Sequence, residues 1–139
     1  MKKVLFLVLM VFAASVLLAG AMPSEDVMKA LDAKVDGLMA AYNEGNATDF
    51  YAGWASSMAA ICTPQVFQMM FVDGHMKNFG AYKSRKIIEA ETVVMADVPN
   101  GLLVYEAEFE KNAKIKLSIN LMKENDEWKF QQVTIAPMP

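Results

Sequence analysis

The spacing of apolar residues along the chain changes near its middle, from a helical period to a strand period. Between residues 25 and 45 the apolar residues recur three and four positions apart, which places them on one face of a helix. That face carries Met28, Leu31, Val35, Leu38 and Tyr42. Ser24 can cap the start of this helix, and Gly45 can end it because glycine takes the left-handed cap conformation without penalty. The pattern predicts one long amphipathic helix.

Two further segments with helical spacing follow a turn at residues 46–49. We expect Thr48 or Asp49 to cap the first of them, whose apolar face would carry Phe50, Trp54, Met58 and Ile61. The second begins at Thr63-Pro64, because threonine caps helices and proline fits the first helical turn. It is expected to end at Gly80 and to bury one stripe of residues: Phe67, Met70, Phe71 and Met76.

From residue 86 the apolar period becomes two, which is typical of strands with one buried face. We expect strands at 87–95, 103–109, 113–121 and 128–135. The chain between them is rich in turn-forming residues. Helices followed by antiparallel strands indicate an α+β domain, in which N-terminal helices pack on an antiparallel sheet.

The register of the middle hairpin follows from the requirement that both apolar sets lie on one side of the sheet. Phe109 opposite Ala113 meets that requirement with a three-residue loop, in which Asn112 would take the left-handed position. Two charged pairs would then face each other across the polar side: Glu108 with Lys114 and Glu106 with Lys116.

Three short motifs resemble those of the nuclear transport factor 2-like superfamily, whose fold is a cystatin-like cone. Residues 42–46 (YNEGN) with 49–51 (DFY) resemble the turn after its first helix, residues 79–83 (FGAYK) resemble the exit from its third helix, and residues 124–130 (ENDEWKF) resemble the turn into its last strand. Within this superfamily, which includes ketosteroid-isomerase-type and SnoaL-type members, the chain looks most like small exported bacterial domains of unknown function.

The resemblance spans residues 25–135 and implies a curved sheet wrapped around one long helix, with a pocket at the open end of the cone. Members of the superfamily include isomerases, dehydratases, hydrolases, transport factors and non-catalytic binding domains. The fold therefore does not decide the function.

The first 21 residues have the layout of a secretory signal peptide. Lys2 and Lys3 precede an uncharged apolar run at 4–18, and small residues follow at 19–21. The run is short for a bilayer, which takes about 20 apolar residues, and no cysteine stands at the cleavage point for a lipid anchor. We expect an exported protein, periplasmic or extracellular, with no stable membrane anchor after cleavage and a single mature domain at 22–139.

The net charge argues against some classes of binding partner, and the single cysteine excludes an intramolecular disulfide. Loss of two lysines with the signal peptide changes the formal net charge from −3 to −5. A mildly acidic domain lacks the basic field that nucleic acid or anionic lipid attracts. Cys62 is the only cysteine, so no intramolecular disulfide can form, and its apolar surroundings indicate a small buried residue.

Few residues could carry catalysis or hold a metal. His75 is the only histidine, and Asp73 lies two residues away, which on a helix turns the two side chains about 200° apart. Glu106 and Glu108 are expected on the charged face of the sheet. Met69, Met70 and Met76 are thioether donors of the kind that bind Cu(I), but adjacent residues diverge on a helix. We expect no catalytic constellation, no metal and no cofactor.

If the cone leaves a pocket, the aromatic and methionine residues on the inward stripes should line it. The predicted lining residues are Tyr42, Trp54, Met58, Met70 and Tyr105. The sequence therefore favours a non-catalytic exported binding or interaction domain, with a small apolar ligand or a protein partner. Two alternatives stay open: an isomerase- or lyase-type enzyme with its site in the cone, and a structural homodimer that uses the open face of the sheet.

Overall fold

The computed structural model describes residues 20–139, so most of the predicted signal peptide lies outside the described residues. The described chain begins with helices, runs through a short strand, and ends in three long strands. The helical elements are α2 (Glu25–Glu44), α3 (Ala47–Tyr51), η1 (Ser56–Met58), α4 (Pro64–Phe67), η2 (Gln68–Met76), α5 (Lys77–Phe79) and η3 (Glu89–Glu91). The strands are β1 (Tyr82–Ile87), β2 (Asn100–Phe109), β3 (Asn112–Glu124) and β4 (Glu127–Pro137).

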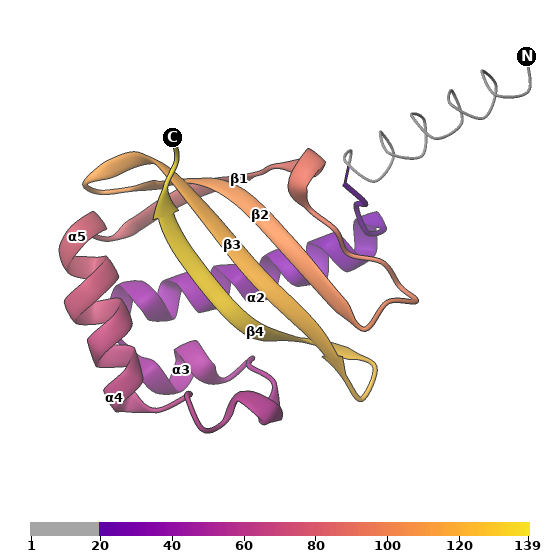
Figure 1. Cartoon of the computed structure of the whole chain (residues 1–139), viewed down its shortest axis with the longest axis horizontal. Coiled ribbons are helices and arrows are strands. Elements are labelled where there is room, and N and C mark those ends of the chain that lie inside the picture. The colour runs from indigo at the N-terminus through magenta and orange to yellow at the C-terminus, as the bar shows by residue number, and fades with distance from the viewer. Residues whose placement is uncertain (1–19) are drawn as a thin grey trace, which may run out of the picture.

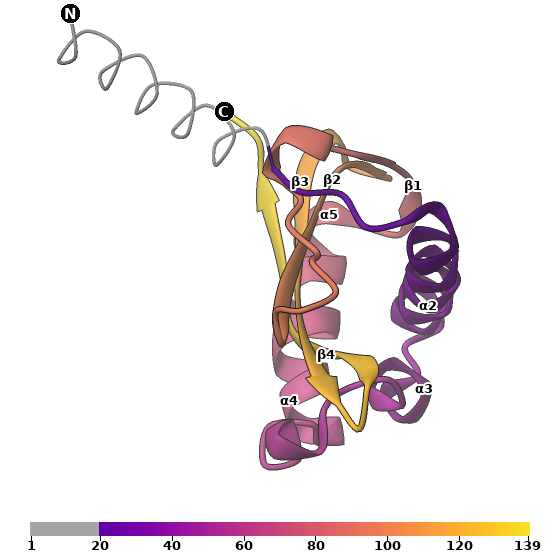
Figure 2. The same ribbon diagram turned by 90° about the vertical axis from the view of Figure 1, so that its right-hand side faces the viewer.

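The four strands form one antiparallel open sheet in the order β1-β2-β3-β4. Helix α2 lies across one side of this sheet (Figures 1 and 2). Residues 64–79, which comprise α4, η2 and α5, form one continuous helix that we call the third helix. The predicted α+β class, with N-terminal helices on an antiparallel sheet, is confirmed.

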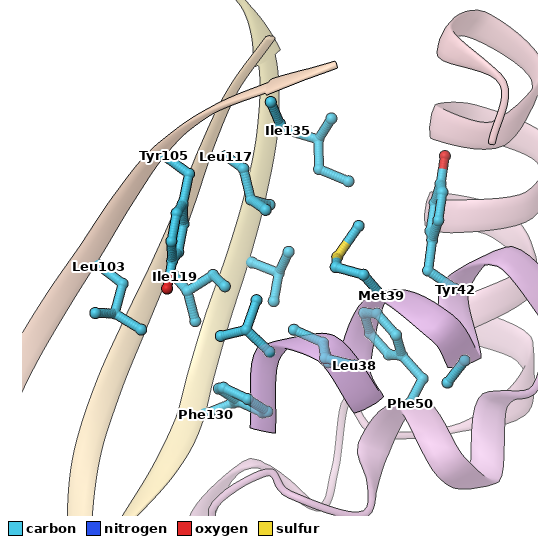
Figure 3. Close-up of a cluster of buried hydrophobic side chains, with 14 of the residues drawn as sticks. Leu38, Met39, Tyr42, Phe50, Leu103, Tyr105, Leu117, Ile119, Phe130 and Ile135 are labelled. Carbon is cyan, nitrogen blue, oxygen red and sulfur yellow. The ribbon is translucent and has the colours of Figure 1, made fainter. Parts of the chain in front are cut away.

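The hydrophobic core lies between α2 and the facing side of the sheet (Figure 3). Apolar positions two apart on each long strand point to α2, as the period of two requires. Leu38 and Met39 of α2 meet the side chains of Leu117 and Ile119, and all four are at most 2% exposed. Burial of this kind stabilises a fold by about 25 cal/mol for each Å² of apolar surface removed from water.

The predicted ends of α2 are confirmed, whereas the start of the second helix differs. The Ser24 side chain accepts a hydrogen bond from the Val27 amide, and Gly45 takes a φ of 68° at the other end. Asn46 caps α3 in place of Thr48 or Asp49, because its side chain accepts from the Asp49 amide at 3.1 Å. The expected helix through Ile61 stops at Tyr51, since the chain at 53–55 bonds instead to the backbone of Phe130.

The third helix begins and ends where the sequence predicts. Thr63 caps it by accepting from the Val66 amide, and Gly80 follows its last residue with a φ of 77°. The buried stripe, however, is different, because residues 68–76 are π-helical and have a wider turn than an α-helix. Aromatic rings four residues apart line one side of the helix, with centroids 5.7, 5.4 and 6.0 Å apart in turn: Phe67, Phe71, His75 and Phe79. Met70, predicted to be buried, is 45% exposed.

The predicted first strand was wrong in position. The strand is Tyr82–Ile87, and the segment after it is a 3-10 turn followed by isolated bridges at Val93. The sequence of β1 shows no alternation of apolar and polar residues, because an edge strand tolerates charged residues on both faces. Val93 pairs with Leu102 and with Ala21, and the Ala21 amide donates to the Thr92 carbonyl at 2.8 Å.

The middle hairpin keeps the predicted faces from Ile115 onward, whereas Ala113, predicted on the buried side, is exposed because a bulge intervenes. Glu106 lies opposite Lys116 as predicted, but Phe109 lies opposite Asn112 and not opposite Ala113. Two residues of β3 face Glu108 alone, which is a β-bulge that restores the alternation of both strands. Glu108 therefore forms an ion pair with Lys83 at 3.7 Å instead of pairing with Lys114. Asn112 is also not left-handed; positive φ occurs at the β3–β4 turn, in Asn125 and Asp126.

Candidate functional site

A groove of about 390 Å³ lies between the start of the third helix, the loop around η1 and strand β4. We call it the β4 groove. Apolar side chains from the loop and the helix form most of its wall: Tyr51, Trp54, Met58, Ile61, Val66, Met70 and Phe71. The strands contribute Asn120, Gln131, Gln132 and Val133.

Backbone hydrogen bonds to β4 hold Trp54 in this wall. The Phe130 amide donates to the Gly53 carbonyl at 2.9 Å, and the Ala55 amide donates to the Phe130 carbonyl at 2.9 Å. The Trp54 ring lies against the rings of Phe50 and Tyr51, with centroids 5.8 and 5.2 Å away. Its Nε1 is buried and has no hydrogen-bond partner among the described residues. Backbone pairing to the strand therefore fixes Trp54 in the wall of the groove.

The third helix separates two adjacent methionines. Met70 lines the β4 groove, whereas Met69 is 65% exposed and lies over a different surface hollow with Gln65 and Asp73. Neighbouring residues in this π-helical segment point about 80° apart, so one faces β4 and the other faces solvent. This pair offers a matched comparison for any test of the groove.

The strand side of the groove is polar but uncharged. Gln131 is the extra residue of a β-bulge, because the pairing moves from Asn120 with Gln132 to Leu121 with Phe130. Side-chain amides of glutamine and asparagine both donate and accept hydrogen bonds. The lining residues of the groove include no Asp, Glu, His, Lys, Arg or Cys. The wall can bind an apolar group and hydrogen-bond a neutral polar one.

The structure brings together three of the five predicted lining residues: Trp54, Met58 and Met70. Tyr42 and Tyr105 lie elsewhere, buried in the core at 1% exposure. The Tyr42 hydroxyl donates to the Gly80 carbonyl at 2.9 Å, and the Tyr105 hydroxyl donates to Asp32 at 3.1 Å. Tyr42 lies on the buried face of α2 and Tyr105 lies on the face of β2 that α2 covers, and burial raises the pKa of each phenol.

The strand residues that line the groove were not among the residues predicted from the sequence. Gln131 is the bulge residue and Gln132 precedes Val133 in the regular ladder, and both line the groove beside the loop that bridges to Phe130. The apolar positions of residues 128–135 do carry a signal for that bulge, because they change phase between Phe130 and Val133. Ile61 also lines the groove. The helical spacing had already placed Ile61 on the same face as Trp54 and Met58, so the sequence did indicate that these three residues lie together.

A second hollow of about 380 Å³ lies on the other side of Trp54, where Cys62 lines it with small residues such as Ala52 and Ala59. Cys62 is half-buried, and burial raises the pKa of its thiol. A raised pKa keeps the thiol protonated, which makes it a poor nucleophile and a poor metal ligand.

A polar cluster ties α2 to β1 and β2. Arg85, whose side chain is 10% exposed, pairs with Asp36 at 2.8 Å and with Asp32 at 3.4 Å. Its guanidinium also donates to the Tyr82 hydroxyl at 2.9 Å and lies 5.1 Å from the centre of the Tyr105 ring. Because the Tyr105 hydroxyl already donates to Asp32, it is not free to stabilise an oxyanion. These contacts join α2 to β1 and β2 and so have a structural role.

His75 and Asp73 do not form a pair. Asp73 accepts a hydrogen bond from the Gln68 side chain at 3.0 Å, while the His75 ring lies between Phe71 and Phe79. Burial lowers the pKa of His75. Within residues 20–139, no three His, Cys, Asp or Glu side chains gather closely enough to hold a metal ion.

Comparison with known proteins adds no assignment. The chain matches no family's sequence model, and no curated protein is detectably similar to it. No helix in the described part of the chain is long and apolar enough to cross a membrane.

Proposed function

We propose that this protein is an exported, non-catalytic binding domain of the nuclear transport factor 2-like type, and that its β4 groove holds an uncharged, largely apolar ligand. The observation that carries the proposal is the composition of the groove wall. Aromatic and aliphatic side chains form most of it, and the polar lining groups are the amides of Asn120, Gln131 and Gln132 with the Tyr51 phenol.

The size of the groove supports a small occupant. Ligand sites in proteins span roughly 300–1,000 Å³, so a volume of about 390 Å³ lies near the lower end of that range. Such a site fits a small molecule or one or two amino-acid side chains. Met58 and Met70 suit it, since methionine has flexible side-chain torsions and a polarisable sulfur that adapt to different apolar shapes.

The alternative of an isomerase or lyase lacks a specific supporting contact. These reactions need a general base placed within hydrogen-bond reach of the substrate. The titratable side chain in the groove wall is Tyr51, and burial raises the pKa of its phenol, which keeps it neutral. A neutral phenol and three amides orient a ligand without moving its protons.

The neutral fluorescent dye N-phenyl-1-naphthylamine tests the proposal, because its emission rises when it enters an apolar site. We expect saturable binding to the wild-type protein. Met70→Glu should weaken binding by about tenfold or more, which corresponds to about 1.4 kcal/mol, because it places a charge in the groove. Met69→Glu on the same helix should leave binding unchanged. Equal binding by the two variants, or none by the wild type, would contradict the proposal.

Export is tested separately. Mass spectrometry of the protein from its native host should find a mature start near Met22. Protein that retains Met1 in the soluble fraction would contradict this part of the proposal without affecting the groove.

A further inference from the structure

The residues at the predicted signal-peptide cleavage site are paired within the fold. The start of the described chain lies beside the connection between β1 and β2 (Figure 2), where Ala21 forms a parallel bridge with Val93. The Ala21 amide donates to the Thr92 carbonyl at 2.8 Å, and the Ala21 carbonyl accepts from the Val94 amide at 2.8 Å. We call this arrangement the docked state of Ala21.

The segment that receives Ala21 is itself firmly held. Val93 and Leu102 of β2 exchange two hydrogen bonds of 2.8 Å. Thr92 is 0% exposed and Val94 is 2% exposed, and the Thr92 hydroxyl accepts from the Val104 amide at 3.2 Å. Ala21 therefore pairs with backbone that the core of the domain keeps in place.

Gly20 is required by this contact and not by export. Its φ is 78°, and a Cβ at this position would lie 2.3 Å from the Glu89 carbonyl oxygen and 2.8 Å from that of Thr92. Bulky and β-branched residues rarely adopt a positive φ. The small-x-small pattern at a cleavage site leaves its middle residue free, and Gly20 is that residue. Export alone would allow another residue at position 20, whereas the docked state needs glycine.

The carbonyl of the bond to be cleaved is the one that the fold occupies. Hydrolysis breaks the C–N bond between Ala21 and Met22: water adds its hydroxyl to the Ala21 carbonyl carbon and its proton to the Met22 nitrogen. A peptidase stabilises the developing charge with its own donors around the carbonyl oxygen. In the docked state that oxygen already accepts from the Val94 amide, so the bond can react only after this part of the domain opens.

We propose that folding closes the cleavage site of this protein. Signal peptidase cuts between Ala21 and Met22 before Gly20 and Ala21 dock, and a chain that docks them first keeps its leader. This inference rests on export as proposed above and specifies the order of cleavage and folding. After cleavage, the Val94 amide and the Thr92 carbonyl lose the partners that Ala21 gave them.

Digestion of the folded full-length protein in detergent micelles by purified signal peptidase tests the proposal. Mass spectrometry follows the rate of cleavage. We expect the wild type to resist and Gly20→Val to be cut at least about tenfold faster, because cleavage of a protected bond follows the population of the open state. Valine at position 20 clashes with the Glu89 carbonyl but leaves Ala19 and Ala21 for the peptidase to read. Equal rates for the two proteins would overturn the proposal.

A second variant alters the receiving segment and leaves the leader sequence unchanged. Val94→Pro removes the amide that donates to Ala21, and it should also accelerate cleavage. Gly45→Ala is the control, since it lies at the far end of α2 and is expected to destabilise the domain without touching the docked residues. An equal acceleration in both variants would assign cleavage to global unfolding and overturn protection by docking.

Amide hydrogen exchange tests the docked state without a peptidase. In the full-length wild type the Val94 amide should exchange slowly, and in Gly20→Val it should exchange at least about tenfold faster. The neighbouring Val93 amide donates to Leu102 and should be protected in both proteins. Unchanged exchange at Val94 would overturn the proposal.

The outcomes separate this inference from export itself. A mature start near Met22 in the host, with equally rapid cleavage of the folded wild type and Gly20→Val, would leave export intact and overturn the inference. Retention of Met1 in the soluble fraction, with no cleavage of any variant, would overturn both. Dye binding in the β4 groove is independent of either result.

Discussion

The hydroxyl of Tyr105 donates a hydrogen bond to Oδ1 of Asp32, 3.1 Å away, and so joins the middle of β2 to helix α2. Arg85 lies over the same tyrosine ring and pairs with the same carboxylate. An inward-facing tyrosine need not line a pocket, because its hydroxyl can donate a hydrogen bond to a residue of the helix that covers it, as Tyr105 does to Asp32.

Tyr105→Phe should destabilise the protein by about 1 kcal/mol, because it removes one hydrogen bond to a half-exposed carboxylate and leaves the ring in place. Chemical denaturation measures this change. Dye binding should be unaffected, because Tyr105 lies outside the β4 groove. A loss of binding with unchanged stability would place Tyr105 in the site and contradict the arrangement described above.

Trp54→Ala should weaken dye binding strongly and cost less than about 3 kcal/mol of stability, which is the lower limit for removing a fully buried tryptophan. The reason is that part of the Trp54 ring already faces the groove. Trp128→Ala serves as the control, since Trp128 lies under Lys123 and outside the groove. Equal binding by the two variants would contradict this prediction.

The pH dependence of stability should include a contribution from His75. Burial between Phe71 and Phe79 lowers the pKa of His75 below the unfolded value of about 6.5. The unfolded chain then binds more protons than the folded one, so stability is complete above pH 6.5 and falls as the pH drops through that value.

Urea midpoints measured between pH 5.5 and 7.5 should therefore decrease toward the acid side in the wild type and stay flat in His75→Gln. Hydrogen bonds from Ser56 and Lys34 lower the pKa of Glu124 and Glu127, respectively. The stability that these two carboxylates contribute is lost only at pH values below about 4.5, outside this window. An identical acid-side decrease in both proteins would assign the effect to other groups.

Two glycines of the first helical region should respond oppositely to alanine. Gly37 lies inside α2, and no atom lies within 4 Å of the place that an added Cβ would occupy, so Gly37→Ala should stabilise by about 0.5–1 kcal/mol through helix propensity. Gly45 has a φ of 68°, so Gly45→Ala should destabilise by about 1 kcal/mol. Thermal unfolding measures both, and a shift of the same sign in the two variants would contradict the assigned cap.

The sequence by itself determined the features that depend on near neighbours. Ser24, Gly45 and Thr63 mark helix ends because caps are satisfied within three or four residues. The period of two in β2, β3 and β4 predicted the buried face of the sheet, because a strand's side chains alternate whatever lies beyond them. The pairing of Glu106 with Lys116 followed from the same alternation.

The tertiary structure alone decided where those faces meet. The bulge opposite Glu108, the π-helical turn that exposes Met70 and the isolated bridge between Trp54 and Phe130 leave no mark in the spacing of apolar residues. A bulge or a wide helical turn costs little free energy locally, so packing against the rest of the fold selects it. For that reason Trp54, Met58 and Met70 meet Gln131 in one groove, while Tyr42 and Tyr105 remain in the core.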